Sequence, residues 1–85
     1  IPLIQYQRPG SPDVATQVAA LADQVRGVML ERLGPVVWES SVSKASHALE
    51  ELEETARLWL MTQPRPAPLS EAAIEELKAA FGCVW

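Results

Sequence analysis

Few residues of this 85-residue chain could do chemistry, and they are widely spaced. The single histidine, His47, lies beside the apolar stripe of a helical segment, where a solvent-facing role is the simplest interpretation. A histidine-based metal cage needs more than one histidine, so this chain cannot build one by itself. The single cysteine, Cys83, has no basic neighbour to activate its thiol, which favours packing over nucleophilic catalysis. Four glutamates spread around a wide helical arc, which is typical of a solvated face rather than a calcium or acid–base site: Glu50, Glu51, Glu53 and Glu54.

The remaining candidate is the connection 31–35, where Glu-Arg-Leu-Gly-Pro joins two short apolar segments. A Gly-Pro turn between strands fixes the backbone, and side chains held at strand ends are often used to build sites. Glu31 and Arg32 are therefore candidates for the edge of a site, although a surface ion pair explains them equally well. The tryptophans are most simply packing residues, but Trp59 and Trp85 are also candidates for an oligomer contact.

The elements that must position this connection follow from hydrophobic periodicity and from helix-boundary signals. Strands are predicted at 1–7, 28–30 and 36–38, with the last two forming a hairpin. A first helix is predicted from Pro12 to Arg26. The strongest helical signal covers 39–63, with the helix itself ending near Met61, and a third helix ends at Gly82. We expect three serines to cap these helices at their N-termini and two glycines to end the first and third: Ser11, Ser41, Ser70, Gly27 and Gly82.

The helical patterns also predict which side chains are buried. The central helix should pack Leu49, Leu52, Ala56 and Trp59 against the sheet. On its outer side, Glu53 and Arg57 have the spacing of an i,i+4 ion pair. The third helix should bury Ile74, Leu77 and Phe81.

The predicted fold is α/β, more specifically a layered α+β arrangement of strand, helix, strand, strand, helix, linker and helix. The strands should be mostly antiparallel, with the helices packed on the sheet. We interpret residues 1–85 as one partial domain, with 63–69 as a proline-rich linker to the last helix. Three strands would leave long unpaired edges, so the sheet is expected to continue in other residues. The opening on strand-like residues without an initiator methionine suggests a piece of a longer protein.

Composition excludes several classes of protein. The formal net charge of −4 and the absence of a basic stripe argue against nucleic acid and anionic membrane surfaces as partners. No apolar run approaches the roughly 18 residues of a membrane helix. A single cysteine and the lack of signal-peptide features predict a cytoplasmic protein.

Two motifs carry a resemblance to a known family. The run 30–37, Leu-Glu-Arg-Leu-Gly-Pro-Val-Val, is followed at the right distance by Ala-Leu-Glu-Glu-Leu-Glu-Glu-Thr-Ala-Arg-Leu at 48–58. Together with Tyr-Gln-Arg-Pro-Gly-Ser at 6–11, they resemble the C-terminal part of the class II aldolase/adducin family. The resemblance covers almost the whole chain and is nearest to the sugar-acid phosphate lyases that act on four-carbon 3-oxo acids.

This resemblance implies a metal-dependent carbon–carbon lyase of carbohydrate metabolism, assembled as a homotetramer. Family members bind a divalent metal, usually zinc, through a His-x-His pair and a third histidine that precedes the glycine of the turn. The metal acts as a Lewis acid, an upstream acid carries protons, and an upstream loop holds the phosphate of a sugar or sugar-acid substrate.

This sequence departs from the family pattern at the turn. The residue before Gly34 is Leu33, which cannot ligate a metal, and the other family catalytic residues would lie before Ile1. No catalytic or metal residue can therefore be transferred to this chain, which alone is expected to be inactive. Three hypotheses remain: a scaffold fragment of a lyase, a non-catalytic adducin-like binding or assembly module, and an unrelated small helical adaptor.

Overall fold

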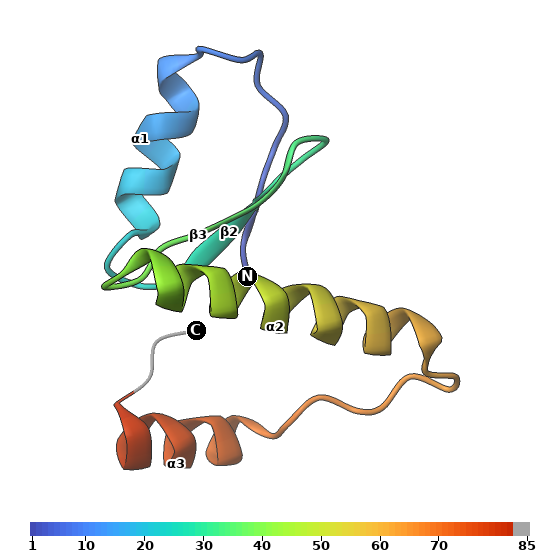
Figure 1. The fold of residues 1–85 in the computed structure, drawn as a ribbon. Coiled ribbons are helices and arrows are strands. Elements are labelled where there is room, and N and C mark those ends of the chain that lie inside the picture. Colours follow the sequence, from blue (N-terminus) through green and yellow to red (C-terminus); the bar gives the residue numbers. More distant parts are fainter. Residues whose placement is uncertain (83–85) are drawn as a thin grey trace.

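The computed structural model describes residues 1–82, and its elements follow the predicted order. Cys83, Val84 and Trp85 lie outside the described residues. The role of Trp85 in an oligomer contact therefore stays a prediction. In the view of Figure 1 the hairpin and the first helix lie above the long central helix, and the last helix lies below it. The elements are β1 (Leu3–Ile4), α1 (Pro12–Leu21), β2 (Gly27–Leu30), β3 (Gly34–Val37), α2 (Val42–Met61) and α3 (Glu71–Phe81).

The three strands form a mixed sheet in the order β1-β2-β3. The predicted hairpin is confirmed, because β2 and β3 pair antiparallel with Leu30 opposite Gly34. The expectation of mostly antiparallel strands is wrong, since β1 runs parallel to β2. The connection through α1 explains this, because a crossover of this length returns the chain in the same direction. The first strand covers two residues rather than 1–7.

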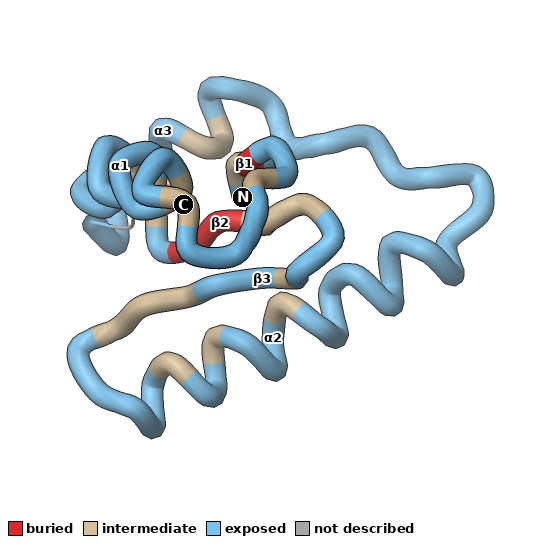
Figure 2. The backbone as a smooth tube through the Cα atoms, turned by 90° about the horizontal axis from the view of Figure 1, so that it is seen from above, coloured by how far each residue is buried: buried red, intermediate tan, exposed pale blue. Residues whose placement is uncertain are grey.

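The buried core is small and lies where β1 meets β2. Among the described residues, only Ile4 and Val28 are fully buried apolar side chains, with 2% and 0% of their surface exposed. Figure 2 shows this buried region flanked by half-buried strand residues. The sheet therefore has a defined register, but few apolar side chains of residues 1–82 are buried against it.

The first helix begins as predicted and ends earlier than predicted. The Ser11 hydroxyl accepts the N–H of Asp13, which confirms Ser11 as the cap. The helix stops at Leu21 rather than Arg26, and the N–H groups of Gln24 and Val25 both donate to the Leu21 carbonyl in a turn.

Gly27 does not close the first helix, contrary to prediction, because it is the first residue of β2. It is buried against the neighbouring strand. A Cβ at this position would lie 2.9 Å from the Val36 carbonyl oxygen and 3.0 Å from Val37 Cγ1. The glycine therefore serves the close approach of β2 and β3 rather than a left-handed helix end.

The central helix α2 has the predicted bounds but buries little of its apolar stripe. Ser41 caps it by accepting the N–H of Lys44, as predicted. Leu52 is half-buried, whereas Leu49, Ala56 and Trp59 are exposed, so their predicted burial is wrong. Length explains the exposure of Ala56 and Trp59: 20 helical residues span about 30 Å, but a four-residue strand spans only about 13 Å. Most of α2 thus extends past the sheet.

The predicted pair between Glu53 and Arg57 is also wrong, because Arg57 pairs with Glu54 one turn away. This partner raises the pKa of Arg57 and lowers the pKa of Glu54. Both groups are exposed, so the pair contributes little to stability.

The last helix is capped as predicted at both ends. Ser70 accepts the N–H of Ala73, and Gly82 adopts the left-handed conformation with a φ of 61°. The linker 63–69 is exposed and contains no helix or strand. Ile74 and Leu77 are half-buried, but Phe81 is 73% exposed, so its predicted burial is wrong. None of the described helices has the length and apolar character needed to cross a bilayer.

Candidate functional site

The turn 31–33 at the tip of the hairpin is a tight three-residue connection. The N–H of Leu33 donates to the Leu30 carbonyl at 3.1 Å and closes it. Arg32 has a φ of 66° and Gly34 a φ of 120°, so both lie in the positive-φ region. Three-residue hairpin loops commonly place a residue in this region. The turn is therefore fixed by its backbone, as the Gly-Pro sequence indicated.

Glu31 is bound by the chain that leaves β1. Its N–H donates to the Ile4 carbonyl at 2.9 Å, and its carboxylate oxygen Oε2 accepts the N–H of Tyr6 at 2.9 Å. Glu31 and Arg32 do not form an ion pair with each other in the described part of the chain, residues 1–82. Glu31 thus joins two segments that are 25 residues apart, a contact that the sequence did not predict.

The residues of this turn do not fit a metal ion. Leu33, at the position where the family resemblance places the third ligand, is 58% exposed and has no donor atom in its side chain. The carboxylate of Glu31 is already engaged by Tyr6. Within the part of the chain that the structure describes, no three His, Cys, Asp or Glu side chains are grouped so that they could hold a metal ion.

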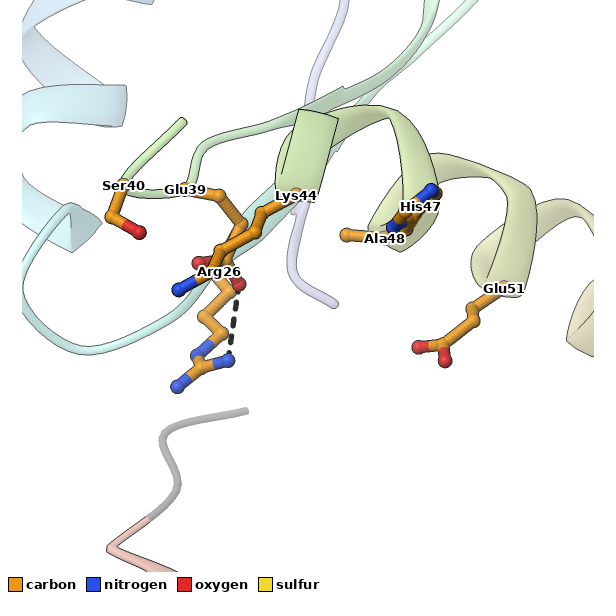
Figure 3. A pocket seen from close by; sticks show the side chains of 7 residues that line it. All are labelled: Arg26, Glu39, Ser40, Lys44, His47, Ala48 and Glu51. Carbon is orange, nitrogen blue, oxygen red and sulfur yellow. Dashed lines mark hydrogen bonds and ion pairs between the residues drawn. The ribbon is translucent and has the colours of Figure 1, made fainter. Parts of the chain in front are cut away.

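A shallow polar hollow lies at the opposite end of the hairpin, between its base and the first turns of α2 (Figure 3). Arg26 and Glu39 form an ion pair of 3.0 Å on one side of the hollow. The two basic and two acidic side chains cancel in formal charge, so the hollow favours neither anions nor cations. Its volume is about 560 Å³, and it is lined by Arg26, Glu39, Ser40, Lys44, His47, Ala48 and Glu51.

His47 lies on an exposed helix surface, as predicted from the sequence. The sequence did not predict that it shares a hollow with Arg26 and Glu39. The pairing of the two hairpin strands would have indicated that these residues lie close together. Because Gly27 lies opposite Val37, the residues just before β2 and just after β3 must meet at its base.

Trp59 lies near the end of α2, with 44% of its surface exposed. The guanidinium carbon of Arg65 lies 5.0 Å from the centroid of its ring. Such a cation–π contact at an exposed site is worth about 0.5–1 kcal/mol. It places the start of the linker over the helix, and the role of Trp59 in an oligomer contact stays a prediction.

Comparisons with known proteins agree with the resemblance seen in the sequence. The sequence model of the Class II Aldolase and Adducin N-terminal domain matches residues 1–60, which include the sheet, α1 and most of α2. A 3-oxo-tetronate 4-phosphate decarboxylase of Cupriavidus necator is 61% identical over 90 aligned positions that cover the whole chain. Enzymes of the same description from Escherichia coli K12 and Haemophilus influenzae are each 39% identical, over 93% and 72% of the chain.

The chain spans 42% of the length of the Cupriavidus necator relative and 38% of the Escherichia coli one. No solved structure matches it. The similarity therefore covers nearly all of this chain but only a part of each relative.

Proposed function

Because this chain belongs to the class II aldolase/adducin family, we propose that it forms part of a lyase acting on a phosphorylated four-carbon sugar acid. The observation that carries the proposal is the 61% identity, along the whole chain, to a 3-oxo-tetronate 4-phosphate decarboxylase. In a 3-oxo acid, the electron pair released when the carboxyl group leaves as carbon dioxide can move onto the 3-oxo oxygen. The resulting enolate is then protonated.

In this proposal, residues 1–85 supply scaffold, subunit contacts and one wall of the site. In this proposal the hairpin tip is the part nearest the chemistry, because the family resemblance implies a metal ligand at the position of Leu33. A divalent metal, zinc by resemblance, would need ligands from beyond residues 1–82, since these contain no group of three His, Cys, Asp or Glu side chains placed to hold a metal ion. The described residues contribute a fixed turn at the edge of the site. Glu31 and Arg32 are the candidate side chains of this chain at that edge.

A non-catalytic module for binding or assembly is the second candidate, and Leu33 favours it. A protein that had lost this metal ligand could keep the fold without the reaction. The third possibility, a small helical adaptor unrelated to this family, is wrong because the family sequence model matches residues 1–60.

A chimera separates the two remaining candidates. Residues 1–85 would replace the matching segment of the Cupriavidus necator relative, and carbon dioxide release from 3-oxo-tetronate 4-phosphate would be measured. We expect the chimera to keep measurable decarboxylation. The relative with its own segment is the positive control.

The matched variant is the same chimera with Leu33→His. If the Leu33 chimera folds but is inactive, and L33H restores both turnover and bound zinc, the non-catalytic interpretation is favoured. If neither chimera turns over although both fold as the relative does, the lyase assignment of this segment fails.

Subunit contacts are the remaining part of the proposal. The last turn of α2 exposes four large apolar side chains that the described sheet does not cover: Leu58, Trp59, Leu60 and Met61. These side chains surround the helix end, and exposed apolar and aromatic groups of this kind are enriched at subunit interfaces. We therefore propose that this helix end contributes to a homotetramer in the cytoplasm.

A further inference from the structure

The parallel ladder between β1 and β2 extends beyond the two strands, to Pro2 before β1 and to Glu31 after β2. The N–H of Met29 donates to the Pro2 carbonyl at 2.8 Å, and the N–H of Glu31 donates to the Ile4 carbonyl at 2.9 Å. In a parallel pair the bonds recur evenly, alternating between the strands. Tyr6 follows Ile4 by two residues, so its N–H is the next donor on that side.

The acceptor for Tyr6 is a side chain. A regular ladder would offer the Tyr6 N–H a backbone carbonyl from the extended partner strand. However, β2 ends at Leu30, and the chain turns at 31–33 toward β3. The carboxylate oxygen Oε2 of Glu31 accepts this N–H at 2.9 Å instead. One residue thus makes two successive ladder bonds, the first with its backbone and the second with its side chain.

We propose that Glu31 is a positioning residue that holds the segment leaving β1 against the turn 31–33. Its carboxylate replaces the ladder carbonyl that the turn removes. A hydrogen bond to an ionised acceptor is roughly twice as strong as a neutral one, which suits a contact at an exposed strand end. The contact fixes the place of Tyr6 relative to Leu33. Its importance for catalysis rests on the proposed function, because that proposal puts the turn at the edge of the site.

The test compares Glu31→Ala and Glu31→Gln with the wild type in the full chain. The control is Glu53→Ala, which removes the same charge from the exposed side of α2. Amide hydrogen exchange is measured by NMR at Tyr6 and at Met29, whose N–H belongs to the same ladder but does not touch Glu31. Decarboxylase turnover is measured separately in the relative-based chimera.

We expect E31A to speed exchange at Tyr6 by about tenfold or more relative to Met29, because a hydrogen bond to a charged group is lost. E31Q keeps an oxygen acceptor and should restore part of the protection, while E53A should match the wild type. In the chimera, E31A should lower turnover more than E31Q does.

The proposal is overturned if Tyr6 exchange is unchanged in E31A, or if E31Q exchanges as fast as E31A. An equal rise at Tyr6 and Met29 also overturns it, because that result indicates general destabilisation. If E31A does not fold, E31Q is compared with E53A instead. The deciding quantity is again the exchange rate at Tyr6 relative to the rate at Met29. A chimera without activity contradicts the proposed function, while Tyr6 exchange still decides the role of Glu31.

Discussion

Gly34, at the end of the turn, is held in a conformation that other residues rarely adopt. Its φ is 120°, and a Cβ added there would have no neighbouring atom within 4 Å. The cost of Gly34→Ala would therefore be backbone strain alone, of about 1–3 kcal/mol. We expect urea denaturation to show a loss of unfolding free energy in this range.

Arg32→Gly provides the matched control in the same turn. Arg32 has a φ of 66°, and left-handed conformations cost about 1–2 kcal/mol for residues with a Cβ. Glycine relieves that cost but gains freedom in the unfolded chain, so the net change should stay within about 1 kcal/mol. If G34A proves as stable as the wild type, the described turn geometry is wrong.

At this scale the sequence predicted the place of the turn but not its main contact. Gly34 and Pro35 indicate a turn by their own backbone preferences, which can be recognised within one short stretch of sequence. The partner of Glu31 is the backbone of Tyr6, and this contact depends on the parallel pairing of β1 with β2 across the α1 crossover. No local pattern carries that information.

At the scale of elements, the N-cap serines are the most sharply testable features. Ser41 caps α2 as predicted, and its hydroxyl accepts the Lys44 N–H at 3.2 Å. Ser41→Ala should cost about 1 kcal/mol of unfolding free energy, measured by urea denaturation. Ser43→Ala, two residues into the helix, should be neutral or slightly stabilising because alanine has the higher helix propensity. Equal losses for both would exclude Ser41 as the cap.

The helix starts and the glycine end of α3 were predicted well because caps are local, whereas the end of α1 and the burial of side chains depend on which elements they pack against. The apolar spacing that includes Val25 continued the pattern of α1, yet this residue lies in the segment that leads into β2. The stripe of α2 correctly predicted a helix. Its burial was overestimated, because the sheet is shorter than the helix and α2 reaches β3 only along part of its length.

At the level of the whole molecule, the main feature of residues 1–82 is the imbalance between a buried apolar core of two side chains, Ile4 and Val28, and an exposed apolar helix end. If subunit contacts cover this end, Leu60→Asp should reduce the oligomer to smaller species, as measured by sedimentation velocity. Leu60 is 70% exposed, so the change should not disturb the described fold. Glu53→Asp on the same helix serves as control. An unchanged mass for L60D would remove the helix end from the interface.

We propose that this chain is part of a lyase related to the 3-oxo-tetronate 4-phosphate decarboxylases. The most direct measurement is carbon dioxide release from 3-oxo-tetronate 4-phosphate by the complete protein that carries residues 1–85, with the Cupriavidus necator relative assayed in parallel. We expect substrate-dependent release of one carbon dioxide per substrate consumed. A folded protein that releases none, under conditions where the relative turns over, would contradict it.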